Sequence, residues 1–344
     1  MPESHYKIFR PAALCAFTVF LLSCATAPLP DWAKSPSAIT RVYPADTYIA
    51  QHGQGQTREA AEASAAAAIS RYFISEVRSA TGILEFERQT NGVTTETQLA
   101  ATSEILVNSQ TELFAVRYAE AWFNKAEKQW ETTAYIDRAE AWAIYEPRFQ
   151  KQAEALRGLY QAAETEGDLF KKALLWGVTN RYAQSADFEA AYSFGQILNS
   201  AKMNVVFSVV RSNTASLPQK IDNARRNADV YIDCPVDFES LIVNAFSRAL
   251  ISEGFPVAKT RAGAAAVCTI TVDEGMQKRE LGIFYYPSLQ AVFTGSSGAL
   301  FTYNASAGSA SAVTPDVAKR RAYTALAEQV QKSFSTEFNA NAEK

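Results

Sequence analysis

Residues 113–137 read LFAVRYAEAWFNKAEKQWETTAYID, and this stretch decides the fold class because it predicts a β-hairpin. Apolar side chains recur at alternate positions on both sides of the polar turn 124–128, which is the period of a strand with one buried face. In the first strand, residues 113–122, this face holds Phe114, Val116, Tyr118 and Trp122. In the second strand, residues 129–137, it holds Trp130, Thr132, Ala134 and Ile136.

A helix precedes the hairpin and completes a first sheet-plus-helix module over residues 37–137. Thr57 is the predicted N-cap of this helix, and the alanine-rich sequence after it favours helix over residues 58–79. Residues 83–89 predict a further strand.

Gly53 and Gly55 lie just before this helix, where we expect a flexible turn between a strand and the helix. They lack the third glycine of a dinucleotide-binding loop and the Lys-Ser/Thr pair of a P-loop. The two glycines therefore do not predict a phosphate site.

A helical segment follows over residues 138–200. Apolar residues recur there at spacings of three and four from Trp142 to Tyr160, which predicts one long helix with Pro147 at its start or at a kink. A polar break at residues 165–168 separates it from two further helices. No repeat of fixed period is present, so the aromatic stripe is interpreted as core rather than as a ligand groove.

A second module is predicted over residues 203–340, in the order β-β-α-β-β-β-β-α and beginning with a strand at residues 203–210. Gly254 ends its first helix, and Thr314-Pro315-Asp316 begins its last. The chain is therefore predicted to be α+β, with two small sheet-plus-helix modules joined by a helical segment.

The N-terminus reads as a bacterial lipoprotein signal over residues 1–23. Lys7 and Arg10 precede an uncharged apolar run that is shorter than the roughly 20 residues of a membrane-spanning helix. The run ends in Leu21-Leu22-Ser23-Cys24, which resembles a lipobox, so Cys24 is the predicted lipidation site and a lipid anchor to the membrane is expected. The alternative is a plain secretory signal in which the cysteine occurs by chance.

Residues 24–36 contain three prolines and predict a short tether between the membrane and the fold. Ala25 would be the second residue of the processed chain. The usual sorting rule for a non-acidic residue at that position gives an outer-membrane location.

Three features in order suggest a family resemblance: Pro30-Asp-Trp32, then Tyr48-Ile-Ala-Gln-His-Gly-Gln-Gly55 with the alanine-rich helix, then a hairpin ending Thr133-Ala-Tyr-Ile-Asp-Arg138. Residues 30–145 resemble the Lpp-twenty lipoprotein family, which is similar to the N-terminal domain of the flagellar protein FlgT. The resemblance implies an α+β fold and an envelope location, and it carries over no catalytic residue. The C-terminal part more weakly resembles envelope assembly lipoproteins such as CsgG, LpoB and LptE.

Charge and histidine content narrow the function. The chain of 344 residues has 33 basic and 36 acidic side chains and a net charge of −3, whereas nucleic-acid binders usually carry a basic excess. Its two histidines are His5, inside the signal, and His52. One imidazole cannot build a His-rich metal site. Neither a metal nor another cofactor is expected.

Cys234 and Cys268 remain after processing. Both are predicted to point inward from neighbouring strands, and in an oxidising compartment they could form a disulfide that closes a loop of about 34 residues. The alternative is a pair of buried free thiols that act as small hydrophobic side chains.

The acidic pairs Asp233/Asp237 and Asp273/Glu274 could serve a hydrolase only if two carboxylates faced each other across a cleft. They are interpreted as solvated charges, and the basic run at residues 319–321 as a solvent face. The sequence thus predicts a non-enzymatic envelope lipoprotein, a structural or assembly component that binds other envelope proteins. The alternatives are a small-ligand or lipid-binding lipoprotein and an envelope hydrolase.

Overall fold

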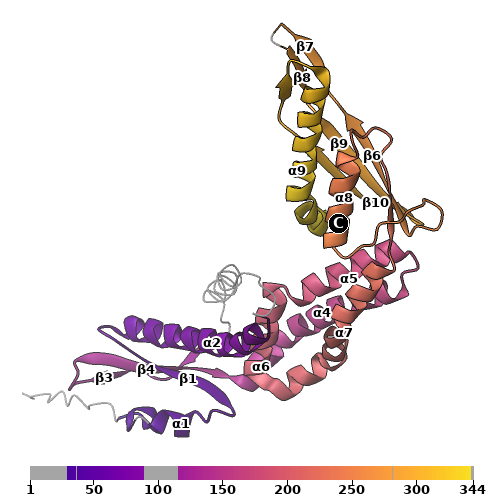
Figure 1. Cartoon of the computed structure of the whole chain (residues 1–344). Coiled ribbons are helices and arrows are strands. Elements are labelled where there is room, and N and C mark those ends of the chain that lie inside the picture. The colour runs from indigo at the N-terminus through magenta and orange to yellow at the C-terminus, as the bar shows by residue number, and fades with distance from the viewer. Residues whose placement is uncertain (1–28, 36, 89–114, 281, 342–344) are drawn as a thin grey trace, which may run out of the picture.

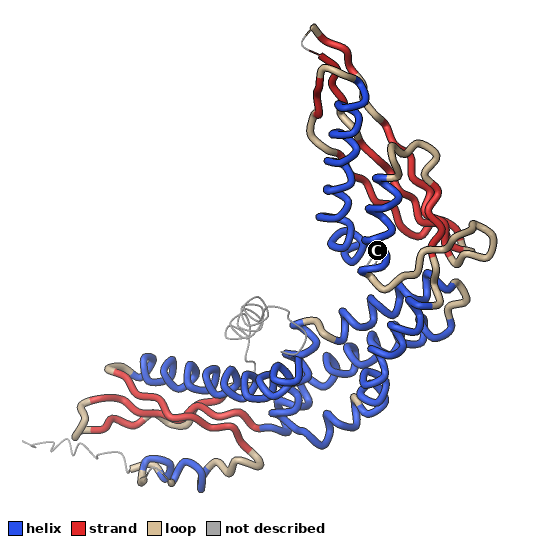
Figure 2. Tube along the Cα trace, viewed as in Figure 1, coloured by secondary structure: helices blue, strands red, loops and turns tan. Residues whose placement is uncertain are grey.

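The computed structural model describes residues 29–35, 37–88, 115–280 and 282–341. A sheet-and-helix module, a helical segment and a second sheet-and-helix module follow one another along the molecule (Figure 1). Strands occur at its two ends and the middle is helical, which confirms the α+β prediction (Figure 2). The predicted signal 1–23 and Cys24 lie outside the described residues.

The N-terminal module contains a four-stranded antiparallel sheet in which β4 pairs with β1 on one edge and with β2 and β3 on the other. The predicted second hairpin strand is confirmed as β4, whereas the predicted first strand is divided into two short pieces. The elements of the N-terminal module are η1 (Asp31–Ala33), α1 (Ala38–Val42), β1 (Tyr48–Gly55), α2 (Arg58–Arg88), β2 (Arg117–Tyr118), β3 (Trp122–Asn124) and β4 (Gln129–Asp137).

Gly53 and Gly55 lie inside β1, so the turn predicted at these glycines is wrong. A Cβ added at Gly53 would lie 2.6 Å from the Cα of Ala65 in α2, and one at Gly55 would lie 2.6 Å from the Cβ of Ala60. The glycines let the alanine-rich helix rest directly on the strand, because neither surface carries a large side chain there. The strand predicted at residues 83–89 is also wrong, since α2 continues to Arg88.

The helical segment has four helices, of which α4 packs against α5 and α6, and α5 packs against α7. Its elements are α4 (Arg138–Thr165), α5 (Leu169–Ala183), α6 (Ala186–Val206) and α7 (Ser208–Arg226). Asp137, Asp168 and Ser185 cap the first three helices by accepting backbone N–H bonds at their N-termini. Pro147 lies within α4 and does not end it.

The strand predicted at residues 203–210 is wrong, because these residues belong to the end of α6 and the start of α7. Several β-branched valines favour a strand there, but packing decides the outcome. Met203 and Phe207, four residues apart, are both buried in the core that continues into the N-terminal module, whereas Val205 is 75% exposed. The helical segment therefore extends to Arg226, and the first strand of the C-terminal module begins only at Val230.

The C-terminal module is built on a four-stranded sheet in the order β10-β9-β6-β5, with β5 parallel to β6 and the other pairs antiparallel. A second, three-stranded sheet has the order β11-β8-β7. The elements are β5 (Val230–Asp233), α8 (Leu241–Ser252), β6 (Ala266–Asp273), β7 (Gln277–Arg279), β8 (Gly282–Tyr285), β9 (Ser288–Gly295), β10 (Gly298–Ser306), β11 (Ala310–Ala312) and α9 (Pro315–Asn341).

The predicted helix boundaries of this module are confirmed. Gly254 follows α8 with φ +86°, a left-handed conformation that favours glycine, and α9 begins at Pro315. Helices α8 and α9 cover one face of the four-stranded sheet (Figure 1). That face is filled by buried aromatic rings, among them Phe246, Phe293 and Phe334. Among the elements that the structure describes, no helix packs on the opposite face.

Candidate functional site

The uncovered face of the four-stranded sheet is the candidate binding surface, and we call it the open face. It consists of the outward side chains of three neighbouring strands. They are Val267, Thr269, Thr271 and Asp273 of β6, Ser288, Gln290, Val292 and Thr294 of β9, and Thr302, Asn304 and Ser306 of β10. Strand alternation explains this set, because every second residue of β9 and β10 enters the buried core and the residues between point outward.

The register places these side chains in rows across the sheet. One row joins Thr271, Gln290 and Asn304, and the Gln290 amide donates a hydrogen bond to Oδ1 of Asn304 at 3.3 Å. The next row joins Asp273, Ser288 and Ser306. Hydroxyl and amide groups thus dominate the surface, which suits hydrogen bonding to a partner.

Two shallow cavities lie on this face. One, of about 390 Å³, is lined by both rows just described. The other, of about 300 Å³, is lined near the opposite end of the strands by Arg261, Thr269 and Thr294 among others. Both are open to solvent, so neither would enclose a lipid chain.

Charge on the open face is confined to its margins. Arg261 lies 3.3 Å from the carboxylate of Asp233, the last residue of the edge strand β5. At the other end, Asp273 accepts a hydrogen bond from the backbone N–H of Gly275 at 3.1 Å. The centre of the face is uncharged, so binding there depends on shape and hydrogen bonds rather than on net charge.

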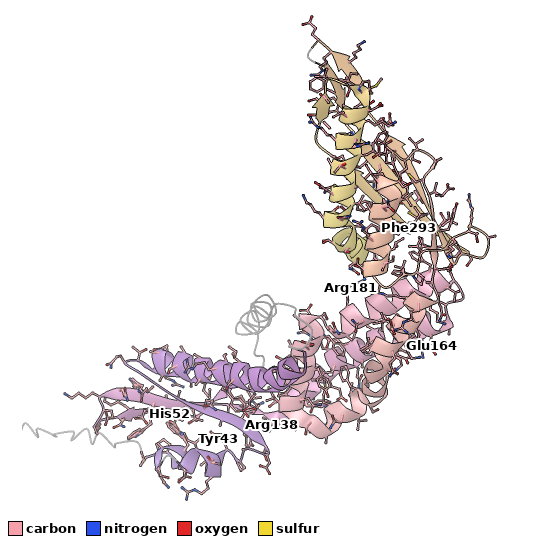
Figure 3. All side chains as sticks on the ribbon, in the orientation of Figure 1. Tyr43, His52, Arg138, Glu164, Arg181 and Phe293 are labelled. Atoms are coloured by element: carbon pink, nitrogen blue, oxygen red, sulfur yellow. The ribbon has the colours of Figure 1, made fainter. Side chains whose placement is uncertain are left out.

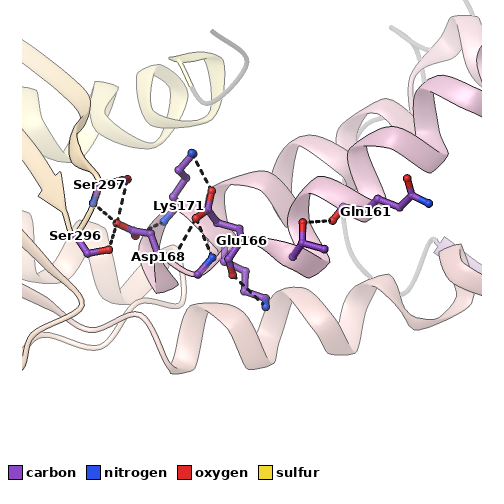
Figure 4. A network of polar contacts seen from close by, with 9 residues as sticks. Gln161, Glu166, Asp168, Lys171, Ser296 and Ser297 are labelled. Carbon is purple, nitrogen blue, oxygen red and sulfur yellow. Dashed lines mark hydrogen bonds and ion pairs between the residues drawn. The ribbon is translucent and has the colours of Figure 1, made fainter.

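A polar network fixes the C-terminal module to the helical segment at Asp168 (Figure 4). The Asp168 carboxylate accepts hydrogen bonds from the backbone N–H of Lys171 in α5 and from the Ser296 hydroxyl, both at 2.9 Å. It also accepts the backbone N–H of Ser297 at 3.0 Å. Burial raises the pKa of Asp168, but these donated hydrogen bonds outweigh burial and the net pKa is lowered.

Apolar packing reinforces the same joint. The Phe170 ring, at the start of α5, lies 5.2 Å from the Phe255 ring and 5.8 Å from the Phe293 ring, and all three are buried. One turn of a helix from the middle segment therefore belongs to the core of the C-terminal module. The sequence indicated only a polar break at residues 165–168. An aspartate just before an apolar helix is a typical N-cap, and this local signal could have identified Asp168. No local signal indicates that Asp168 also contacts Ser297, 129 residues later in the chain.

Cys234 and Cys268 are free thiols in this structure, and the disulfide considered from the sequence stays a prediction. Cys268 is buried on the covered face of β6, and Cys234 follows β5 and is half-buried. Burial, more than the nearby Asp237, raises the pKa of the Cys234 thiol to about 12, and burial also raises the pKa of Cys268. Both are therefore protonated at neutral pH, where they are poor nucleophiles.

The carboxylates considered for a hydrolase contact backbone N–H groups, basic side chains or a tyrosine hydroxyl. Asp237 accepts the backbone N–H groups of Ile242 and Val243 at the start of α8, at 3.0 and 2.9 Å. Glu274 lies 2.6 Å from Lys319 of α9 and accepts a hydrogen bond from the Tyr323 hydroxyl at 2.9 Å. The side chains of Asp233 and Asp273 make the contacts described above at the margins of the open face.

In the basic run 319–321, Arg320 and Arg321 are exposed, as predicted for a solvent face, and each of the three side chains also has a partner. Lys319 pairs with Glu274, and Arg320 pairs with Glu239. Arg321 donates to the backbone oxygen of Ser311 at 2.9 Å. These contacts link α9 to three other parts of the module.

His52 lies in β1, at the far end of the molecule from Phe293 (Figure 3). Its Nε2 is 3.9 Å from Glu131, and its ring lies 6.0 Å from that of Trp32. Across the described ranges, His, Cys, Asp and Glu side chains do not gather in groups of three or more that could hold a metal ion. Within the same residues, no helix combines the length and apolar character needed to cross a membrane.

Comparison with known proteins identifies one distant structural relative and no family. No protein-family model matches the sequence, and no curated protein matches it. Among solved structures, the chain is similar to that of the secreted protein HP1454 from the human pathogen Helicobacter pylori. The identity is 12%, the match covers 83% of this chain and 98% of that chain, and the TM-score is 0.28. A TM-score of this size supports no inference about function.

Proposed function

We propose that this chain is a lipid-anchored, non-enzymatic protein of the bacterial outer membrane, and that it acts as a structural or assembly component by binding other envelope proteins. The anchor rests on the positive n-region, the short apolar run and the small residue before Cys24. The order of motifs over residues 30–145 supports membership of the Lpp-twenty family. Trp32 of the first motif is buried, as a structural role for that motif requires.

One observation carries the binding role: the open face is presented on a module that is joined to the helical segment by buried rings and hydrogen bonds. Phe170 and Asp168 fix the joint by packing and by hydrogen bonds. The helical segment shares its other core with the N-terminal module. A chain built this way presents a broad hydrogen-bonding surface, uncharged at its centre, on the module that lies at the opposite end from the predicted tether.

The contacts of the carboxylates and the raised pKa values of the thiols favour binding over catalysis. The candidate carboxylates cap a helix or pair with cations, as described for Asp237 and Glu274. The two thiols have raised pKa values, which suppresses the thiolate that nucleophilic catalysis needs. The cavities are shallow and open to solvent, which favours a macromolecular partner over a lipid or another small ligand that needs an enclosed site.

The anchor and the binding role have separate tests. Labelled palmitate should be incorporated by the wild-type chain and not by a Cys24→Ala variant, which should also leave the membrane fraction. Chemical crosslinking in intact cells, followed by affinity purification, should recover at least one other envelope protein with the wild-type chain. Recovery of no other protein would contradict the binding role, and labelling of the Cys24→Ala variant would contradict the anchor.

A further inference from the structure

The edge strand β10 lacks the features that usually protect a sheet edge. It spans Gly298–Ser306 and contains neither a charged residue nor a proline. Edge strands without such residues readily pair with another strand. A register shift between Ala299 and Phe301 disturbs only the first residues of β10, so the remainder is a regular strand.

The register shows which backbone groups of β10 point away from the sheet. Ala307 donates its N–H to the oxygen of Pro287 at 3.0 Å, so these two opposite residues form a hydrogen-bonded pair. Hydrogen-bonded and non-hydrogen-bonded pairs alternate along an antiparallel ladder. The backbone N–H and C=O groups of Thr302, Asn304 and Ser306 therefore point to the outer side of β10, and we call these three residues the free edge.

The free edge is accessible to a partner. Thr302, Asn304 and Ser306 are all exposed. In the portion of the chain that the structure describes, no other segment donates or accepts a backbone hydrogen bond along it. The free edge is unpaired, although β10 is held in place by its pairing with β9 and by the side chains that it contributes to the aromatic core.

The absence of charge points to the kind of strand that fits. At a two-fold axis each residue meets its own copy or a close neighbour, so a charged residue there would face a like charge. The nine residues of β10 contain none. If the axis passes Asn304, that residue meets its own copy and Thr302 meets Ser306 of the second copy, which pairs hydroxyl and amide groups.

We propose that two copies of this chain pair antiparallel through the free edge of β10. The pairing forms a continuous sheet in the order β5-β6-β9-β10-β10-β9-β6-β5. Because the two-fold axis is perpendicular to the sheet, both pairs of helices lie on one side and both open faces lie on the other. The dimer thus doubles the surface offered to a partner.

Cysteine crosslinking in intact cells tests this arrangement with the full chain. In the dimer, the two Cα atoms at position 304 lie about 5.5 Å apart, within the range of a disulfide. Asn304→Cys should give a disulfide-linked dimer after mild oxidation. The control is Gln290→Cys, on the same face but in β9, where the two copies are separated by three strand spacings, roughly 14 Å, and no bond can form. The unmodified chain gives the background from the native cysteines.

A second pair of variants tests the dimer without an introduced cysteine. Thr302→Pro deletes one free-edge N–H in each copy, and proline is tolerated at such a position of an edge strand. Thr302→Val keeps the backbone donor. Sedimentation velocity of the detergent-solubilised chain should show dimerisation weakened about tenfold or more by proline and little changed by valine.

Three outcomes would overturn the β10 dimer. One is no dimer with Asn304→Cys above the background of the unmodified chain. Another is equal dimerisation of the two Thr302 variants. The third is a disulfide between position 304 and a different protein in place of the second copy, which would assign the free edge to a heterologous strand.

Discussion

The Asp168 carboxylate lies 3.0 Å from the backbone nitrogen of Ser297, a residue 129 positions later in the chain. The same carboxylate caps α5 through Lys171. A single side chain therefore starts a helix of the middle segment and holds the turn between β9 and β10. Because β10 and the open face follow directly from that turn, this contact links the joint to the candidate binding surface.

Asp168→Ala should lower the free energy of unfolding by about 1–2 kcal/mol, because it removes the N-cap of α5 and the hydrogen bonds that the buried carboxylate accepts from Ser296 and Ser297. Urea unfolding monitored by tryptophan fluorescence measures the loss. Asp222→Ala is the control, since Asp222 makes an exposed i,i+4 pair with Arg226 that is worth less than about 0.5 kcal/mol. Equal losses in the two variants would contradict the structural role of Asp168.

The contribution of Asp168 should depend on pH in one direction. Its pKa is lowered in the folded chain, because the donated hydrogen bonds outweigh burial. A carboxylate with a lowered folded-state pKa stabilises the fold above its unfolded value of about 3.9 and loses that effect as the pH falls through the folded value. The difference in unfolding free energy between wild type and Asp168→Ala should be constant from pH 7 to 5 and shrink below about pH 4. A difference that grows on acidification would have the wrong sign.

Gly53→Ala should destabilise the N-terminal module, because the new Cβ would lie 2.6 Å from the Ala65 Cα and the helix backbone must move away. Overpacking of this kind typically costs about 1–3 kcal/mol. Gly158→Ala is the matched control, since Gly158 lies within the exposed part of α4 with no atom within 4 Å of an added Cβ. It should stabilise by about 0.5–1 kcal/mol. Thermal unfolding of the two variants should therefore shift in opposite directions.

The thiols of Cys234 and Cys268 should react slowly with iodoacetamide at pH 8 in the folded chain, because burial raises the pKa of both. In urea both should be alkylated rapidly. Mass spectrometry without reductant should find two alkylated thiols after unfolding. A mass lower by two hydrogens with no alkylation would instead show the disulfide that the sequence left open.

Local patterns predicted much of the fold. The alternation over residues 129–137 gave β4, and Thr314-Pro315-Asp316 gave the start of α9. Such signals succeed because strand alternation and helix caps depend on neighbouring residues. The valines near residues 203–210 predicted a strand that the structure does not contain. Burial of Met203 and Phe207 in a core shared with distant residues outweighed the local strand preference.

The candidate site was less accessible to sequence reasoning. Alternation in β9 and β10 indicates which residues share a face, but only the sheet order shows that the faces of β6, β9 and β10 adjoin and that β10 is an edge. The partners of Asp168 lie 129 residues away, and no local pattern encodes them. Gly53 and Gly55 were interpreted as a turn because their close packing against α2 becomes visible only in three dimensions.

Site-specific photo-crosslinking in intact cells tests the central claim most directly. A photoreactive amino acid at Gln290, in the middle of the open face, should form an adduct with another envelope protein. The same amino acid at Lys151, on an exposed part of α4, should form none. Equal adducts at both positions, no adduct at Gln290, or an adduct only with a second copy of the chain would contradict a binding role for this face.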